Sequence, residues 1–510
     1  MTRVLRAENI TSSCGVTPLI RYIIKHTSVI WISFTLILSW LIPLTQILND
    51  SVNRTVIFEA PYEIGIMFVI PVCMLMAIRT FDYLTKEKAT TFFHSLPYSR
   101  TKLFVVNGLT GFALIIVPLF FVSVMAMLVS LIKGTGVVLY FFALFGFLSS
   151  VCFYVYAFTI LMVMLFSNKG SLFPMTAILF CYTEIMFFII NILLSNMYDI
   201  NGVFTPSETG FFFLSPLRVC FTSRLRCDYI IGEKNYNYGF AFTNIEKVLP
   251  IELICGILML ALAYVLYRLR KSERSGEVVA FKSCRYIFKW GFSISLAMFM
   301  TLIFGITSVY NIKDISTKNL VICAIFVFFA LILYMIAEMI ISKKFNIFKK
   351  VTLELIPVLA VTLILSVLTV TDAFGIKNYV PEPENVKYLT VHIENKRDET
   401  LMVSTVTTIH INSDPDNLAM KKAFMDLHKR IVKEKPLKDV SDTMVEFIYY
   451  GENAYIDDRR YTIPKEYLDP VKLYIELRKD EKETIVHYGR EFDIIDPTYY
   501  VRRFISFVMY

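Results

Sequence analysis

Long apolar runs fill the first three quarters of the chain and are separated by short polar connections. A helix crosses the hydrocarbon core of a bilayer with about 20 mostly apolar residues. Nine runs approach this length, at residues 28–48, 62–78, 105–132, 137–166, 172–194, 250–267, 290–309, 319–342 and 351–371. The second run is short, and the fourth is long enough to tilt or break near Gly146. The pattern predicts an all-α polytopic membrane protein with about nine transmembrane helices.

The pattern changes from about Thr371 onward, where apolar residues alternate with polar ones. Alternation of this kind is typical of a half-buried strand and involves Leu389, Val391 and Ile393. Asp414-Pro415 is suited to a helix start, and apolar residues then recur at helical spacing, at Met420, Ala423, Phe424, Leu427 and Ile431. Further elements are expected at 445–450 and 459–464 (strands) and from Asp469-Pro470 (helix). Residues 372–510 are therefore predicted to form an α+β soluble domain, in which no nucleophile, base or metal constellation is visible.

Composition and charge support insertion in a membrane and predict the orientation of the chain in it. The chain is 56% hydrophobic and 18% charged, whereas ordinary domains are about 25% charged. With the N-terminus in the cytoplasm, the cytoplasmic connections hold more than twice as many Lys and Arg residues as the outer loops. This distribution predicts an N-terminus inside the cell. Nine spans then put the C-terminal domain outside the cell membrane, and a miscount by one span would put it in the cytoplasm.

Cysteine and histidine do not indicate a disulfide framework or a metal site. Most of the nine cysteines lie in or beside apolar runs, where cysteine behaves as a small hydrophobe. Cys220 and Cys227 share one loop, so they could pair or remain two free thiols. The six histidines show no metal-ligand spacing.

The connection at 79–104 is the segment with the clearest functional pattern. Its apolar residues near one helical face are Phe81, Leu84, Phe92 and Leu96. Pro97 should stop this helix, and Ser99 can cap the next one, which continues into the third apolar run. A helix of this kind could transmit a displacement caused by a partner protein to the membrane-spanning helices. It could equally be an ordinary interfacial helix attracted to anionic lipid.

The stretch LTKEKATTFFHSLPYSRTKLF resembles the loop between the second and third spans of bacterial ABC type-2 exporter permeases, which has the pattern SLP-x-x-R-x-x-LF. The resemblance covers roughly residues 15–270 and includes a short amphipathic stretch before the first span (18–26) and a long outer loop (195–249). In that family, the outer loop forms short re-entrant helices. Three additional helices at 271–371 and the extracytoplasmic domain at 372–510 resemble, less specifically, an enlarged Gram-positive subgroup.

The resemblance implies a contact with an ABC ATPase subunit, at or near which six residues would lie: Lys86, Glu87, Thr91, Phe92, Phe93 and Arg100. The chain has no G-x-x-x-x-G-K-[ST] phosphate loop, so ATP and Mg would bind the separate ATPase subunit and this chain would need no cofactor. A permease of this kind would work as a homodimer, or as a heterodimer with a sister permease, among membrane lipids and without nucleic acid.

Glu184 is the one acidic residue near the middle of an apolar run. An ionised carboxylate at that depth costs at least about 2.5–3.5 kcal/mol, so it should face protein or water. It could line a transport path, or it could be a protonated structural residue bonded to a neighbouring helix. Three further glutamates lie close to run ends, where we expect them to reach headgroups or water: Glu252, Glu338 and Glu354.

The leading hypothesis is export of an amphipathic substrate, such as a lipid, peptide or antimicrobial, powered by a partner ATPase. An ion-coupled secondary transporter is the first alternative, and it predicts intramembrane relay residues. A membrane enzyme would need a catalytic cluster, and no catalytic residue can be assigned. A membrane sensor with an extracytoplasmic ligand-binding domain is the remaining alternative.

Overall fold

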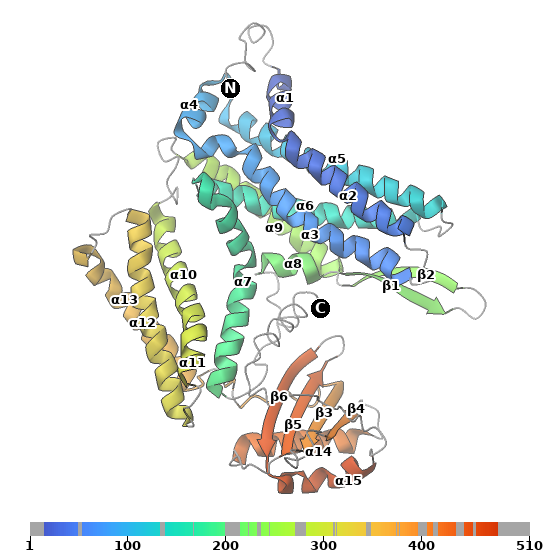
Figure 1. Cartoon of the computed structure of the whole chain (residues 1–510), viewed down its shortest axis with the longest axis vertical. Coiled ribbons are helices and arrows are strands. Elements are labelled where there is room, and N and C mark those ends of the chain that lie inside the picture. Colours follow the sequence, from blue (N-terminus) through green and yellow to red (C-terminus); the bar gives the residue numbers. More distant parts are fainter. Residues whose placement is uncertain are drawn as a thin grey trace. The chain divides into compact units, whose positions relative to one another are not determined.

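The computed structural model describes most of the apolar runs and the core of the C-terminal domain (Figure 1). The described residues are 15–48, 54–132, 138–166, 168–198, 215–222, 224–231, 236–243, 245–270, 282–309, 312, 314–342, 348–373, 375–376, 378–395, 405–411, 417–434, 443–451 and 455–477. The chain divides into two compact units. One comprises Met1–Thr183 and Phe213–Ile287, and the other comprises Glu184–Phe212 and Phe288–Tyr510.

The first unit is a bundle of long helices around α6. Its elements are α1 (Thr17–His26), α2 (Ser28–Leu48), α3 (Arg54–Thr80), the 3-10 turn η2 (Asp82–Thr85), α4 (Glu87–Ser95), α5 (Arg100–Ile132), α6 (Val138–Leu165), the start of α7 (Lys169–Tyr198), α8 (Pro216–Thr222), β1 (Arg224–Ile231), β2 (Tyr236–Thr243) and α9 (Ile245–Leu269). α6 packs against α3, α5 and α9. The apolar window of α6 is 83% buried, against 33% or less for the other described candidate spans, so α6 forms the core of this unit. It runs through Gly146 without a break.

The second unit contains the end of α7 and three further long helices. These elements are α10 (Lys282–Met300), which continues through the π-helical turn η5 (Thr301–Gly305) into α11 (Ile306–Val309), then α12 (Ile315–Ser342) and α13 (Phe348–Val370). α12 and α13 pack along each other. At the end of α7, the Tyr198 hydroxyl donates a hydrogen bond to the Thr369 carbonyl at 2.6 Å, and the Tyr198 ring packs with Val309 and Ile322.

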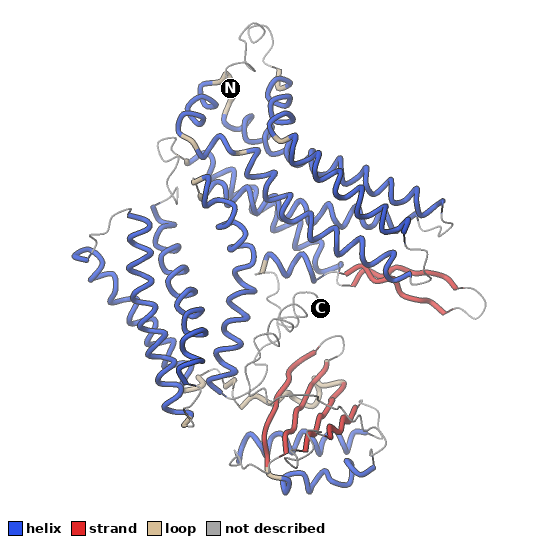
Figure 2. The backbone as a smooth tube through the Cα atoms, viewed as in Figure 1, coloured by secondary structure: helices blue, strands red, loops and turns tan. Residues whose placement is uncertain are grey.

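A helix lies at each of the nine predicted positions. The tube view in Figure 2 shows the helices of the chain in blue. Over the described residues, six of them are long and apolar enough to cross a membrane. The number is seven if α1 and α2, which meet at a 60° bend, form one broken span. Shorter apolar helices cover Gly65–Thr80 and Glu354–Val370. The prediction of a mostly helical chain with several helices apolar and long enough to cross a membrane is confirmed, and the count of nine spans is not.

The C-terminal part is an α+β domain, as the alternating pattern predicted. Its elements are β3 (Tyr388–Asn395), β4 (Thr405–Ile411), α14 (Leu418–Glu434), β5 (Thr443–Tyr450), β6 (Tyr455–Ile463), η7 (Lys465–Val471) and α15 (Lys472–Leu477). The strands form one antiparallel sheet in the order β4-β3-β5-β6. Alternate residues of β5 are buried, and they share a hydrophobic core with the inner face of α14.

The loop between α7 and α9 is described only from Ser215 onward, so the re-entrant helices that the resemblance implied stay a prediction. Within its described residues it contains one short helix, α8, and an antiparallel hairpin in which Arg224 of β1 pairs with Thr243 of β2. Cys220 on α8 is a buried free thiol, so no disulfide joins it to Cys227. The apolar stretch at 210–214 lies outside the described residues.

Candidate functional site

The predicted amphipathic segment between α3 and α5 is two short helices rather than one. Lys86 has an extended backbone (φ −126°, ψ 126°) that separates η2 from α4. The prediction of a single apolar face is therefore wrong, because Phe81 and Leu84 are buried before the break. Phe92, after the break, is 44% exposed. The end of the helix is as predicted, with an extended Leu96 preceding Pro97.

One side of α4 is fixed to α1 and α9 by aromatic contacts. The Phe93 ring stacks on Tyr83 with 4.6 Å between centroids, and it lies 5.7 Å from the ring of Tyr22 on α1. The Thr90 hydroxyl donates to the Tyr83 carbonyl at 2.9 Å. The Tyr83 hydroxyl lies 3.0 Å from that of Tyr267 near the end of α9. Burial raises the pKa of Tyr83, so this phenol stays protonated and the hydrogen bond is kept.

Two arginines join this region to the ends of α6 and α9. Arg270 is 5% exposed and donates to the carbonyls of Val163 (2.9 Å), Met164 (3.4 Å) and Leu84 (2.8 Å). Arg100 donates to the carbonyls of Arg268 and Arg270 at 3.4 and 3.3 Å. Carbonyls at a helix C-terminus lack partners within the helix and favour a cation. Burial lowers the pKa of Arg270 to about 10, which still leaves it protonated at neutral pH.

The connection from α4 to α5 is short and well capped. Only Leu96–Ser99 separate the two helices. The Ser99 hydroxyl accepts a hydrogen bond from the Lys102 amide at 3.2 Å, so the predicted N-cap is confirmed. The Tyr98 hydroxyl donates to the Gly15 carbonyl at 3.1 Å. A displacement of α4 would therefore be passed directly to the first turn of α5.

The opposite side of α4 is an exposed surface with four of the six candidate residues. We call this the α4 surface, and it consists of Lys86, Glu87, Thr91 and Phe92. The other two candidates do not belong to it. Phe93 is 5% exposed, and the guanidinium of Arg100 bonds to the end of α9. Phe93 is a buried anchor of the segment, whereas Arg100 is exposed at the start of α5 and its guanidinium joins the segment to the end of α9.

The sequence reasoning missed Tyr83, Tyr267 and Arg270, which hold the segment in place. A signal for Arg270 was available, since it lies three positions beyond the sixth apolar run, where an arginine can reach helix carbonyls. No pattern in the sequence joins Tyr83 to Tyr267, because the two lie 184 positions apart.

Glu184 lies on α7 and is 4% exposed. It is therefore buried in protein, as expected for a carboxylate at this depth. Glu184 would be buried whether it lines a transport path or is a protonated structural residue bonded to a neighbouring helix.

Glu338 and Glu354 form an ion cluster with Lys289, in which Glu338 is buried and the Glu354 side chain is 25% exposed. The Lys289 ammonium lies 3.0 Å from Glu338 Oε2 and 2.6 Å from Glu354 Oε2. The Tyr334 hydroxyl donates to Glu354 Oε2 at 3.0 Å. The expectation is corrected for Glu338 alone, because packing brings one end each of α10, α12 and α13 together, where this buried carboxylate gains the cation that makes burial tolerable.

Glu252 is also buried rather than near water. It lies on α9, is 0% exposed, and has a hydrogen bond of 2.5 Å with the Ser150 hydroxyl of α6. The expectation that it reaches headgroups is therefore wrong. The physical reason is that the heavily packed α6–α9 contact covers it.

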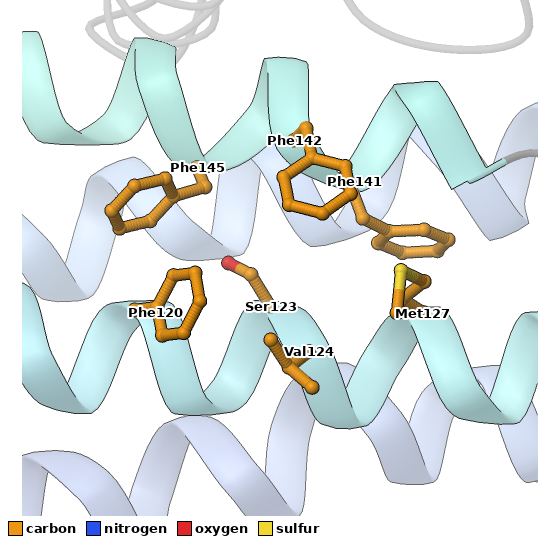
Figure 3. A pocket seen from close by; sticks show the side chains of 7 residues that line it. All are labelled: Phe120, Ser123, Val124, Met127, Phe141, Phe142 and Phe145. Atoms are coloured by element: carbon orange, nitrogen blue, oxygen red, sulfur yellow. The ribbon is translucent and has the colours of Figure 1, made fainter.

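A small hollow between α5 and α6 is almost entirely apolar. Figure 3 shows the side chains that line it: Phe120, Ser123, Val124, Met127, Phe141, Phe142 and Phe145. The one hydroxyl among them, that of Ser123, donates to the Leu119 carbonyl at 2.9 Å. Apart from this hydroxyl, which is already bonded to the backbone of its own helix, the lining is hydrophobic.

Among the described residues, no group of three or more His, Cys, Asp or Glu side chains could hold a metal ion. Comparisons of the chain with protein-family models, with curated proteins and with solved structures found no match. The functional interpretation therefore depends on the geometry above and on the resemblance of the α4 segment.

Proposed function

We propose that this chain is the membrane-spanning permease subunit of an ATP-binding-cassette exporter, and that the α4 surface docks on a separate ATPase subunit. The observation that carries the proposal is the exposed Phe92 on α4, a short helix that begins at the exposed Lys86 and Glu87 and whose other side is fixed by Phe93 and Thr90. An exposed aromatic residue on a rigid base, surrounded by charge, is suited to anchor a protein interface.

The route from the α4 surface into the membrane has two branches. One passes through Leu96–Ser99 into α5, and the other passes through the carbonyls that Arg270 holds at the ends of η2 and α6. Closure of the ATPase subunits would move α4. This movement would shift the equilibrium between the inward-facing and the outward-facing arrangement of the spans. ATP and Mg would bind the partner, because the chain has no phosphate loop.

The proposal includes an amphipathic substrate (a lipid, peptide or antimicrobial), nine spans with a cytoplasmic N-terminus, and an extracytoplasmic C-terminal domain. The assembly would be a homodimer or a heterodimer with a sister permease. Glu184 is proposed to contact the transport path.

An ion-coupled secondary transporter is the second candidate. It is favoured by the Lys289–Glu338–Glu354 cluster, since intramembrane ionisable groups commonly mark ion pathways. The two candidates predict different energy sources. Transport that continues in an ionophore and stops when ATP is removed supports the exporter, and the reverse result supports the secondary transporter.

The docking proposal is tested with Phe92→Asp and Glu87→Lys in the full chain, co-expressed with a candidate ABC ATPase from the same genome. Loss of an interface hot spot costs about 2 kcal/mol or more, so Phe92→Asp should lower co-purification of the ATPase about 30-fold. Leu473→Asp is the matched control, because Leu473 is an equally apolar, 65% exposed residue of the C-terminal domain. Unchanged co-purification in both α4 variants, with normal membrane insertion, would rule out docking at this surface.

A further inference from the structure

Glu252 is a fully buried carboxyl with an incomplete set of partners. It lies on α9, one of the apolar helices long enough to cross a membrane. Its Oε2 atom is bonded to the Ser150 hydroxyl of α6. Its Oε1 atom is buried and has no hydrogen-bond partner among the described residues. Packed polar atoms are normally satisfied, so this exception calls for a physical explanation.

Counting hydrogens assigns the protonation state of this group. The Ser150 hydroxyl has one hydrogen, and two acceptors lie within its reach: Glu252 Oε2 and the Phe147 carbonyl at 2.8 Å. If Glu252 were ionised, the two acceptors would compete for that one hydrogen. If Glu252 carries a proton, its own O–H donates to Ser150, and Ser150 donates to Phe147. Only in the protonated form does each of the two contacts have a hydrogen of its own.

The surroundings of Glu252 do not compensate a negative charge. The titratable groups that interact with it are Cys220 of α8 and Tyr154 of α6, and a thiol and a phenol are both neutral near pH 7. Among the described residues, no Lys, Arg or His side chain bonds to Glu252. Glu338 and Glu354 differ from Glu252 because each forms an ion pair with the Lys289 ammonium. Burying an unpaired charge is costly enough that such a group is neutralised instead.

We propose that Glu252 is a proton-binding site that is occupied while α6 and α9 are packed together and is emptied when that contact opens. The proton bound to Oε2 passes to water that enters between the helices, because a hydrated glutamate is ionised near neutral pH. Proton release as a step of a transport cycle rests on the proposed function above. Proton binding in the closed arrangement is independent of any ATPase.

Infrared difference spectroscopy tests the protonation state in the purified full chain. Glu252→Gln keeps the shape and the donor to Ser150 but has no acid. The wild-type minus Glu252→Gln spectrum at pH 7 should contain the carbonyl band of a protonated carboxylic acid. Ser150→Ala, which keeps the acid and removes its acceptor, should shift that band to higher frequency. Carboxylate bands in place of the acid band would overturn the proposal.

Alkylation of the native thiol at Cys220 tests the link to helix opening. Cys220 is 0% exposed, so a maleimide reaches it only when this region opens. Between pH 7 and pH 9 the alkylation rate should rise several-fold more in the wild type than in Glu252→Gln, in which no charge can appear at position 252. An equal rise in both proteins would overturn the link. Failure of the ATPase to co-purify would refute the exporter proposal and leave both of these results unaffected.

Discussion

Removal of the Lys289 ammonium is the perturbation whose energetic cost can be argued most fully from the structure. The Lys289 and Glu338 side chains are 4% and 5% exposed, and the ammonium also holds Glu354 at 2.6 Å. Breaking one partner of a buried ion pair costs about 3–5 kcal/mol, because a charge is left without compensation. Lys289→Met keeps the length of the side chain and removes the charge, so we expect a loss of that size in the free energy of unfolding.

The measurement is unfolding in mixed micelles, followed by circular dichroism, for the wild type and two variants. The second variant combines Lys289→Met with Glu338→Gln and Glu354→Gln, which removes the whole cluster. Because the large cost comes from uncompensated charge, the triple variant should be more stable than the single one. A loss below about 1 kcal/mol in Lys289→Met, or a triple variant no more stable than the single one, would refute the reasoning.

Two further predictions concern single side chains. His428 is buried between the Tyr449 and Tyr461 hydroxyls, and burial lowers its pKa to about 3. Since the unfolded state binds the proton near pH 6.5, the C-terminal domain should lose stability as pH falls below that value, by about 2 kcal/mol from pH 7 to pH 5. Hydrogen exchange of β5 measures this loss, and the same slope in His428→Gln would contradict the assignment. Arg270→Met should leave ATPase binding intact but abolish ATP-driven transport, because the α4 surface keeps its residues while the bonds to α6 are lost. Loss of both activities together would indicate a general folding defect.

The sequence predicted positions of helices well because a membrane span must be apolar along its whole length. The same reasoning could not place the partners of buried charges. Glu338 and Lys289 are neighbours only because α10 and α12 pack against each other, and the pattern of apolar residues does not show which helices are adjacent.

The α4 segment shows a second limit of sequence reasoning. The break at Lys86 occurs without glycine or proline, so no local signal marked it. It is fixed instead by long-range contacts, chiefly those of Tyr83 with Tyr267 and of Arg270 with Leu84. In the C-terminal domain, β4 was not predicted because only Ile409 and Ile411 mark its buried side among the residues whose burial is described.

Buried carboxylates show how similar sequence signals lead to different chemistry. Glu252, Glu338 and Glu354 all lie near the ends of apolar runs. Two of them share a lysine, and the third has a single hydroxyl partner. The environment, rather than the position along the run, determines whether the carboxyl is paired with a cation or carries its own proton.

A photo-crosslinking amino acid at position 92 tests the docking role of the α4 surface most directly. In native membranes, the crosslinked partner should be an ATPase whose sequence contains a phosphate loop, and the same crosslinker at position 473 should not capture it. Crosslinks from position 92 to lipid alone would contradict the exporter proposal and would show that α4 is an ordinary interfacial helix.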